Sequence, residues 1–407
     1  MSLATFRARI PAINSWLLAG VCASIPLTVA PAYWLTAVML LLWLAEGRFV
    51  AKFRALADEP LVWICLAYYG VFVASLFWSD DLEWGRRMLG RQNFFLLAPL
   101  YFSVARREHV GRYISAFLAS VAFCEALALY NWAQMHVWPG LPDGIRVDKG
   151  ADDTAPFVDR ILYAPALALA GYLAGHRLLF DTSGTKMRLV YAGLLATTAF
   201  NLVISGGRAG LVGFLALLTL LAFQRFARRP VLAAAVSALL VGGIVIGGYA
   251  GNDYFRMRAD RVVNELEHYE ELPKASVSQR LIYWQNALRI FRDAPLAGVG
   301  IGDYPEVYRA VNERYTPAWA PAWNPHNHYL YVLTSTGLLG GVLLVALLGV
   351  PLLRRGHDDS RRRMRRALPL LFMVICLFES YLMRSNTSLM YVVFLALLWS
   401  PARESRA

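Results

Sequence analysis

Charged residues are scarce in this chain, at 17% of its 407 residues, whereas about one quarter is usual in soluble proteins. Hydrophobic residues make up 57%, and they gather in long runs. A membrane span needs about 20 consecutive apolar residues, so these runs exclude a cytosolic enzyme, a secreted disulfide scaffold and a disordered chain. The sequence therefore predicts an all-α, polytopic integral membrane protein with a single transmembrane domain over residues 1–407.

Cysteine is also scarce, and its positions exclude the usual cysteine sites. The chain has four cysteines, all inside apolar runs and none in a Cys-x-x-Cys pair: Cys22, Cys65, Cys124 and Cys376. This pattern predicts neither a disulfide framework nor a zinc site. The chain also lacks a P-loop and an HExxH motif, so nothing points to ATP hydrolysis.

Hydropathy predicts about twelve membrane spans. Basic residues (Arg7, Arg9) precede the first apolar run and a second run follows at once, which indicates a first span rather than a cleaved signal peptide. The expected spans are 13–29, 31–46, 60–78, 91–105, 112–137, 160–179, 188–205, 209–224, 231–250, 328–353, 367–383 and 387–401.

The basic residues between the spans predict the orientation. With the N-terminus in the cytoplasm, every short inner segment is rich in arginine or lysine, including the stretch from Arg354 to Arg366. Inner loops of membrane proteins carry such an excess. The net charge of +12 therefore indicates membrane topology and not nucleic-acid binding.

One outer connection, residues 251–327, is unusually long, and loops of this length are usually functional. Apolar residues recur at helical spacing from Phe255 to Tyr269 and again from Leu281 to Phe291, which predicts two amphipathic helices. Asp293–Pro295 ends the second helix, and Gly298, Gly300 and Gly302 then allow sharp turns. Two interpretations are open: helices lying on the bilayer surface, or a lid over an outward-facing site.

The segment Ser205–Gly210 (SGGRAG) is the first candidate site. Its glycines allow a close backbone approach, and we expect Ser205 to cap the helix that follows. A helix N-terminus beside the guanidinium of Arg208 is suited to an anion, although an arginine at a span end is often only an interfacial anchor.

Arg280 and two histidines are the next candidates. Arg280 is expected near a helix N-terminus, where a cation is unfavourable unless an anion lies nearby, although taken alone a solvated surface arginine is the simpler interpretation. Asn324 and Pro325 predict an N-cap and first helical position, which would put His326 in the first turn as a neutral imidazole able to accept a proton. His328, an alternative base, lies two positions further on and would leave the helix on a different face, so the two histidines are not expected to share one role.

Weaker candidates lie between residues 81 and 91. Arg87 and Arg91 share a helical face and offer a second phosphate contact, although interfacial anchoring is the simpler interpretation. Asp81 and Glu83 resemble an acidic pair that holds a metal in some membrane glycosyltransferases, a spacing that is common by chance.

Together these features resemble the bacterial O-antigen ligase and O-antigen polymerase superfamily. The resemblance rests on twelve spans, the SGGRAG turn, an arginine before Tyr283-Trp284 in the long outer loop, and Pro325–Leu330 preceding Thr336–Gly340. It is densest over residues 190–345, and the N-terminal half matches only in topology.

The resemblance implies a GT-C-like fold in the bacterial inner membrane and an active site that faces the periplasm. It implies metal-independent, inverting transfer of a polysaccharide from undecaprenyl diphosphate, without a cofactor and with no nucleic-acid partner; in the ligase branch the acceptor is lipid A–core. By motif, Arg208 and Arg280 match the essential arginines of the family, and His326 matches its histidine, with His328 as an alternative register.

The chemistry of these residues agrees, because guanidiniums can stabilise a departing diphosphate and an imidazole can accept the proton of a sugar hydroxyl. The ligase branch is favoured because one late loop carries both Arg280 and His326. Three alternatives stay open: a polymerase that extends the lipid-linked glycan, a metal-dependent glycosyltransferase using Asp81 and Glu83, and, from a different class, a lipid-linked glycan transporter or flippase.

Overall fold

The computed structural model describes residues 3–147, 153–355, 359 and 361–400, and this part of the chain is helical with no strand. Its α-helices are α1 (Leu3–Ser24), α2 (Val29–Glu46), α3 (Phe49–Ala57), α4 (Pro60–Ser75), α5 (Leu82–Gly90), α6 (Ala98–Val104), α7 (Val110–His136), α8 (Arg160–Phe180), α9 (Thr185–Ile204), α10 (Arg208–Arg225), α11 (Pro230–Gly251), α12 (Asp253–Glu267), α13 (Ser276–Asp293), α14 (Tyr304–Tyr315), α15 (His328–Leu353), α16 (Ala367–Ile375) and α17 (Ser385–Trp399). The predicted all-α fold is confirmed.

Seven helical segments among the described residues are long and apolar enough to cross a membrane: Val29–Glu46, Pro60–Trp78, Arg107–His136, Thr185–Ile204, Arg208–Arg225, Pro230–Gly251 and His328–Leu353. Other predicted spans coincide with α1, α8 and the shorter α17. A polytopic membrane protein is therefore the architecture that the helices support.

Two predicted spans are not single helices. Span 91–105 contains only the short turn η2 (Asn93–Phe95) and α6, and span 367–383 contains α16 followed by η5 (Tyr381–Met383). Both segments are mostly buried inside the bundle. In these two segments the apolar run indicates burial rather than a continuous helix, because a buried non-helical stretch is as hydrophobic as a buried helix.

The bundle is organised around α17, whose residues from Thr387 to Trp399 are all buried. Close packing of α8 against α10 forms part of the same core, since a Cβ placed on Gly210 would lie 2.3 Å from the Cβ of Ala164. The two backbones can approach this closely only because glycine has no side chain there. This contact holds the start of α10 firmly against α8.

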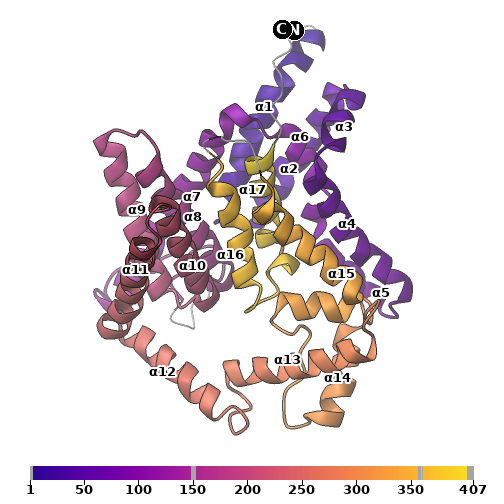
Figure 1. The fold of residues 1–407 in the computed structure, drawn as a ribbon, viewed down its shortest axis with the longest axis vertical. Helices are drawn as coiled ribbons and strands as arrows, with labels where there is room; N and C mark the ends of the chain where they lie inside the picture. The colour runs from indigo at the N-terminus through magenta and orange to yellow at the C-terminus, as the bar shows by residue number, and fades with distance from the viewer. Residues whose placement is uncertain (1–2, 148–152, 356–358, 360, 401–407) are drawn as a thin grey trace.

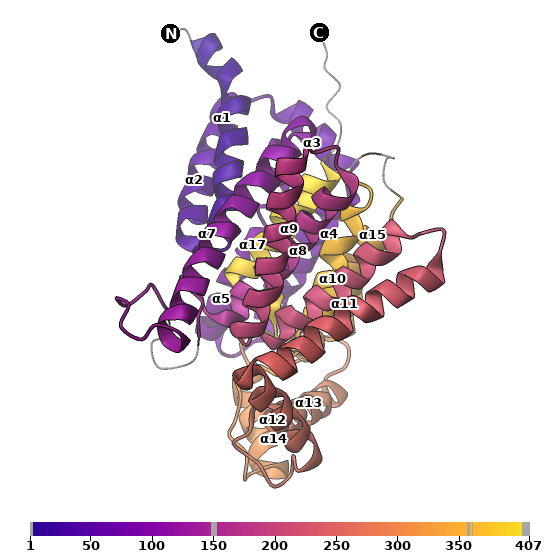
Figure 2. The ribbon, with the colours of Figure 1, turned by 90° about the vertical axis from the view of Figure 1, so that its left-hand side faces the viewer.

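Helices α12, α13 and α14 form a separate layer below the bundle, at the end opposite the start of α1 (Figures 1 and 2). The two predicted amphipathic helices are α12 and α13, and α13 ends at Asp293 as expected. The sequence did not indicate α14. Gly298 and Gly300 have φ of 68° and 97°, as the predicted sharp turns require.

The turn after α13 is fixed to the bundle through a break in α15 at Gly337, where φ is 64°. The N–H of Val299 donates to the carbonyl of Thr334 at 2.8 Å, and the N–H of Leu338 donates to the carbonyl of Pro295 at 2.8 Å. The backbone groups that the break frees are thus paired with the turn. The layer α12–α14 is therefore anchored to a membrane helix rather than only tethered to it.

Candidate active site

A cavity of about 410 Å³ lies between the bundle and the α12–α14 layer. We call it the cationic cavity, because its charged lining residues are six cations and two carboxylates: Arg160, Arg208, Arg258, Arg261, Lys274 and Arg280, with Glu265 and Glu379. Like charges gathered in one enclosed space repel one another, so an anion bound among them is favourable. The cavity is suited to a ligand with several negative charges.

Arg208 is the first residue of α10 and enters the cavity from the bundle. Gly206 turns the backbone with φ of 67°, and one Nη of Arg208 donates to the Oγ of Ser276 at 3.2 Å. Because Ser276 begins α13, this bond connects the bundle to the outer layer. The first turn of α10 also borders the cavity, and its N–H groups have no partner within the helix.

The predicted capping role of Ser205 is wrong. The N-cap of α10 is Gly207, which makes no side-chain cap, and Ser205 instead terminates α9. The Ser205 side chain is fully buried, and its hydroxyl has no hydrogen-bond partner. The tight turn at Gly206 leaves Ser205 two residues before the N-cap position of α10, at the end of the preceding helix.

Arg280 lies in the second turn of α13 and lines the same cavity. The structure therefore brings together Arg208 and Arg280, two residues that are far apart in the sequence. Arg208 enters from the bundle and Arg280 from the outer layer. An anion between them would contact both parts of the protein.

Glu379, in the connection between α16 and η5, is the link between this cavity and His326. Its side chain is 2% exposed and lines the cavity, and its Oε2 accepts a hydrogen bond from Nδ1 of His326 at 2.8 Å. Arg384 lies 3.4 Å from the same oxygen. A carboxylate only accepts hydrogen bonds, so in the neutral imidazole Nδ1 of His326 carries the proton and Nε2 keeps a free lone pair.

His326 does not lie in the first turn of a helix, so that prediction is wrong. The N-cap of α15 is Asn327, whose Oδ1 accepts from the N–H of Leu330 at 3.1 Å, and the helix begins at His328. His326 has φ of 49°, and Asn324, the expected cap, accepts its N–H at 2.7 Å. Both asparagines are suited to capping, and the later one caps the helix.

The ring of His326 is held in place from both sides. It stacks on the ring of Tyr283 with 5.9 Å between centroids and 24° between planes, and Glu379 holds its Nδ1. Burial raises the pKa of the Tyr283 phenol, so this neighbour is neutral. The His326 side chain remains 28% exposed, which leaves it accessible to a substrate.

Neither histidine lines the cavity: His326 is joined to it through Glu379, whereas His328 lies in the core. Its side chain is fully buried, its Nε2 lies 2.8 Å from the hydroxyl of Tyr68, and its N–H donates to the carbonyl of Cys376. These contacts join α15 to α4 and α16. Of the two histidines, only His326 is placed where a substrate can reach it.

The weaker candidates lie outside the cationic cavity. Arg87 pairs with Glu83 at 3.1 Å, and both side chains are largely exposed. The guanidinium of Arg91 lies over the ring of Trp323, 5.4 Å from its centroid. Asp81 caps α5 by accepting the N–H of Trp84 at 2.8 Å. The structure therefore gives these residues local partners.

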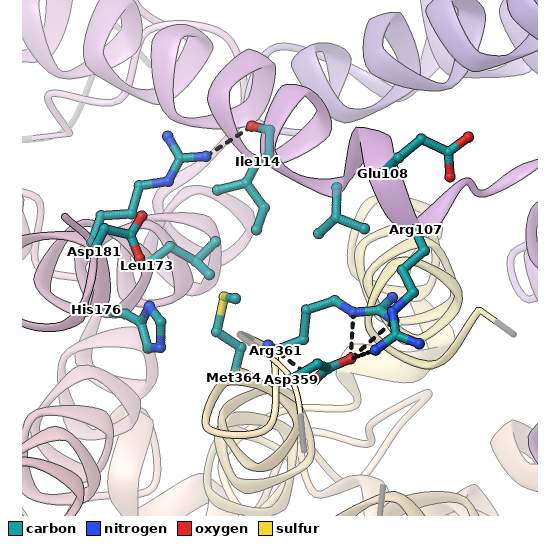
Figure 3. A pocket seen from close by; sticks show the side chains of 12 residues that line it. Arg107, Glu108, Ile114, Leu173, His176, Asp181, Asp359, Arg361 and Met364 are labelled. Atoms are coloured by element: carbon teal, nitrogen blue, oxygen red, sulfur yellow. Dashed lines mark hydrogen bonds and ion pairs between the residues drawn. The ribbon is translucent and has the colours of Figure 1, made fainter. Parts of the chain in front are cut away.

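A further cavity, of about 530 Å³, lies at the other end of α8, where Arg107 and Arg361 converge on Asp359 (Figure 3). Burial raises the pKa of the Asp359 carboxyl, but Arg361 and Arg365 beside it outweigh burial and hold that pKa below its ordinary value. Cations and carboxylates are equally represented on its wall. This arrangement is that of a structural ion-pair cluster rather than an anion site.

Sequence reasoning missed Glu379 as a site residue, as well as the other cations of the cavity. Glu379 is a lone acidic residue at the end of an apolar run, and such a residue is a functional candidate in a membrane protein. Arg160 begins α8, and Arg258 and Arg261 lie on α12. Only the packing of these helices shows that they share one space.

Comparison with known protein families adds an independent finding. Residues 193–345 match the model of a family described as O-antigen ligase, and no curated protein matches the chain. The matched stretch includes Arg208, Arg280 and His326, and it extends past the break at Gly337. Over these residues the chain is similar to the O-antigen ligase family, a match that supports its place in the O-antigen ligase and polymerase superfamily.

Proposed function

We propose that this protein is an O-antigen ligase, which transfers a polysaccharide from undecaprenyl diphosphate to a sugar of lipid A–core at the periplasmic face of the bacterial inner membrane. The family implies lipid-linked polysaccharide substrates. The observation that carries the proposal is the cationic cavity, whose buried lining residue Glu379 also holds Nδ1 of His326 and leaves the Nε2 of that histidine without a partner among the described residues. These groups provide what transfer from a lipid diphosphate requires.

In the proposed mechanism, Arg208 and Arg280 hold the diphosphate of the donor. As the bond between the anomeric carbon and the diphosphate oxygen breaks, its electron pair stays on the diphosphate, and the guanidiniums stabilise the added charge. Planar guanidiniums form paired hydrogen bonds to phosphate oxygens, so this stabilisation does not require a metal ion.

His326 accepts the proton of the attacking acceptor hydroxyl on Nε2 while the oxygen bonds to the anomeric carbon. Attack from the face opposite the leaving diphosphate inverts the anomeric centre. Glu379 holds the ring in the tautomer that leaves Nε2 free and stabilises the imidazolium as it forms. Glu379 is therefore a positioning residue in this proposal.

The test is a purified assay with a defined lipid-linked donor, lipid A–core and a metal chelator. We expect glycosylated lipid A–core from the wild type, and a loss of about 100-fold or more in R208A, R280A and H326A. Near wild-type ligation by any of the three would refute its assigned role, and loss of wild-type activity with chelator would favour the metal-dependent alternative.

The product distinguishes the remaining alternatives. A longer lipid-linked glycan identifies a polymerase, whereas a change of membrane side without new bonds identifies a flippase. Either result in place of glycosylated lipid A–core would overturn the ligase proposal.

A further inference from the structure

A smaller cavity of about 340 Å³ lies directly beside the cationic cavity. We call it the aromatic cavity; its lining residues come from the ends of α7 and α9 and from the junction of α11 with α12: Trp132, His136, Ile204, Gly251, Asn252, Asp253 and Tyr254. These residues take no part in the mechanism above. The chain thus has a second candidate binding space next to its candidate active site.

The side chain of Tyr254 lies where the two cavities adjoin. A Cβ placed on Gly206, which lines the cationic cavity, would lie 3.0 Å from the hydroxyl of Tyr254. Arg258, which also lines the cationic cavity, donates to the same hydroxyl at 2.9 Å. Tyr254, which lines the aromatic cavity, therefore contacts two residues that line the cationic cavity.

The aromatic cavity combines ring faces with hydrogen-bonding groups of both kinds. The rings of Trp132 and His136 stack with 5.8 Å between centroids and 18° between planes. Nδ1 of His136 lies 3.1 Å from the carbonyl of Trp132, which only accepts, so in the neutral ring Nδ1 is the donor and Nε2 is an acceptor. Asn252 uses its Oδ1 to cap α12, which leaves its amide N–H groups as donors.

The charge of this cavity indicates a different ligand from that of the cationic cavity. Its one formally charged residue among the described lining residues is Asp253, whose side chain is 97% exposed and lies 3.4 Å from a guanidinium nitrogen of Arg256, so no unbalanced cation is present in this lining to attract a phosphate. A carboxylate disfavours phosphate, but it accepts hydrogen bonds from neutral hydroxyl groups. Aromatic faces with nearby donors and acceptors suit a ligand that has both an apolar face and hydroxyl groups, such as a pyranose ring.

We propose that the aromatic cavity binds sugar residues of the donor glycan beyond the one that reacts; this inference rests on the proposed function. The donor is indicated because the aromatic cavity adjoins the cationic cavity at Gly206 and Arg258, on the side where α10 begins with Arg208. None of its lining residues comes from the segments that carry His326 and Glu379, where the acceptor hydroxyl is activated.

The test compares two donors that share the same lipid diphosphate, one with a single sugar repeat and one with several. We expect His136→Ala and Trp132→Ala to lower kcat/KM for the long donor about tenfold, which corresponds to the upper part of the range that one aromatic contact contributes. Both variants should stay within about twofold of wild type on the short donor. His136 is exposed, so its loss does not open the core.

Trp138→Ala is the matched control, because Trp138 is 62% exposed, lies next to α7 and does not line the aromatic cavity. It should leave both donors unaffected. Equal losses of kcat/KM on both donors in W132A and H136A would overturn the inference and indicate that Trp132 and His136 only anchor α7 at the membrane interface. Unchanged kcat/KM on both donors, or a change confined to the KM of the acceptor, would also overturn it.

A failure of the wild type to transfer either donor would count against the proposed function and not against the aromatic cavity. The binding of the lipid-free oligosaccharide of the donor to the purified wild type, followed by saturation-transfer NMR, then tests the cavity alone. We expect a signal that H136A weakens and W138A does not, and its absence in the wild type would overturn the inference.

Discussion

Replacing Glu379 with glutamine tests the link between the cationic cavity and the proposed base. Glutamine keeps the size of the side chain and removes its charge, so the 2.8 Å contact with His326 changes from a charge-assisted hydrogen bond to an ordinary one or is lost. Hydrogen bonds to charged groups contribute about 1.5–3 kcal/mol, and about 1.4 kcal/mol corresponds to a factor of ten in rate. We expect kcat to fall on the order of 10- to 100-fold.

The assay is transfer over a series of lipid-linked donor concentrations, with single-turnover measurements at saturating donor to isolate the chemical step from binding. Glu265→Gln is the matched control: Glu265 lines the same cavity and is also buried, but its Oε2 accepts the N–H of Val277 and does not contact His326. Both substitutions remove one negative charge from the cavity. We expect E379Q to lower kcat much more than E265Q, with a smaller effect on the KM of the donor.

A double substitution determines whether Glu379 acts through His326. If it does, E379Q should have almost no further effect in an H326A background, because residues that act as a unit are not additive. A loss from E379Q that is the same in both backgrounds, or a kcat of E379Q close to that of the wild type, would refute the positioning role.

Three further predictions concern residues outside the reaction. His328→Leu should lower the free energy of unfolding by about 1–3 kcal/mol, because it leaves the buried Tyr68 hydroxyl without its partner. Transfer per folded molecule should stay within a few-fold of wild type. Thermal melts and activity assays measure the two effects, and abolished transfer in folded protein would make His328 the base. Gly337→Ala should destabilise the protein by more than about 1 kcal/mol, since the added Cβ would lie 2.2 Å from the carbonyl oxygen of Leu296. It should also make the α12–α14 layer easier to cleave in limited proteolysis. An unchanged melting temperature would count against the anchoring role of the break. Because the pKa of Asp359 is depressed in the folded protein, its carboxylate stabilises the fold above the unfolded pKa of about 4, and this stabilisation is lost as the pH falls through the lower folded pKa. Asp359→Asn should therefore lower the melting temperature at pH 7 and reduce the decline of the melting temperature in acid. Parallel plots of melting temperature against pH for the two proteins would contradict this.

The apolar runs predicted the helices well but could not show where a run is interrupted. In the predicted span 367–383, α16 ends at Ile375, and the chain continues without regular helix to η5. The break is sustained by contacts from elsewhere, such as the carbonyl of Cys376 accepting the N–H of His328. A local pattern does not contain such partners, so hydropathy alone extends the helix through the break.

The candidate site shows the same division between local and non-local information. Arg208 and Arg280 could be chosen from their sequence context, because each was expected near a helix start on the outer side. Glu379 is 53 positions from His326, and their contact exists only because the start of α15 packs against α16. Asn324 and Asn327 are both suited to be the N-cap of α15, and the residue types that mark a helix start do not show which of the two is used.

The distribution of charge in the cationic cavity suggests why its parts lie on two layers. Arg208 belongs to the membrane bundle and Arg280 to the α12–α14 layer, and one Arg208–Ser276 hydrogen bond connects them across the cavity. Without an anion, the six cations repel one another across this boundary; with a diphosphate between them, the same groups attract both layers to one ligand. Donor binding should therefore stabilise the layer against the bundle, because a ligand shifts a protein towards the arrangement that it contacts best. Hydrogen exchange in α12 and α13 should slow when a lipid diphosphate is added to the wild type and remain unchanged in R208A, and equal protection in both proteins would separate the layer from diphosphate binding.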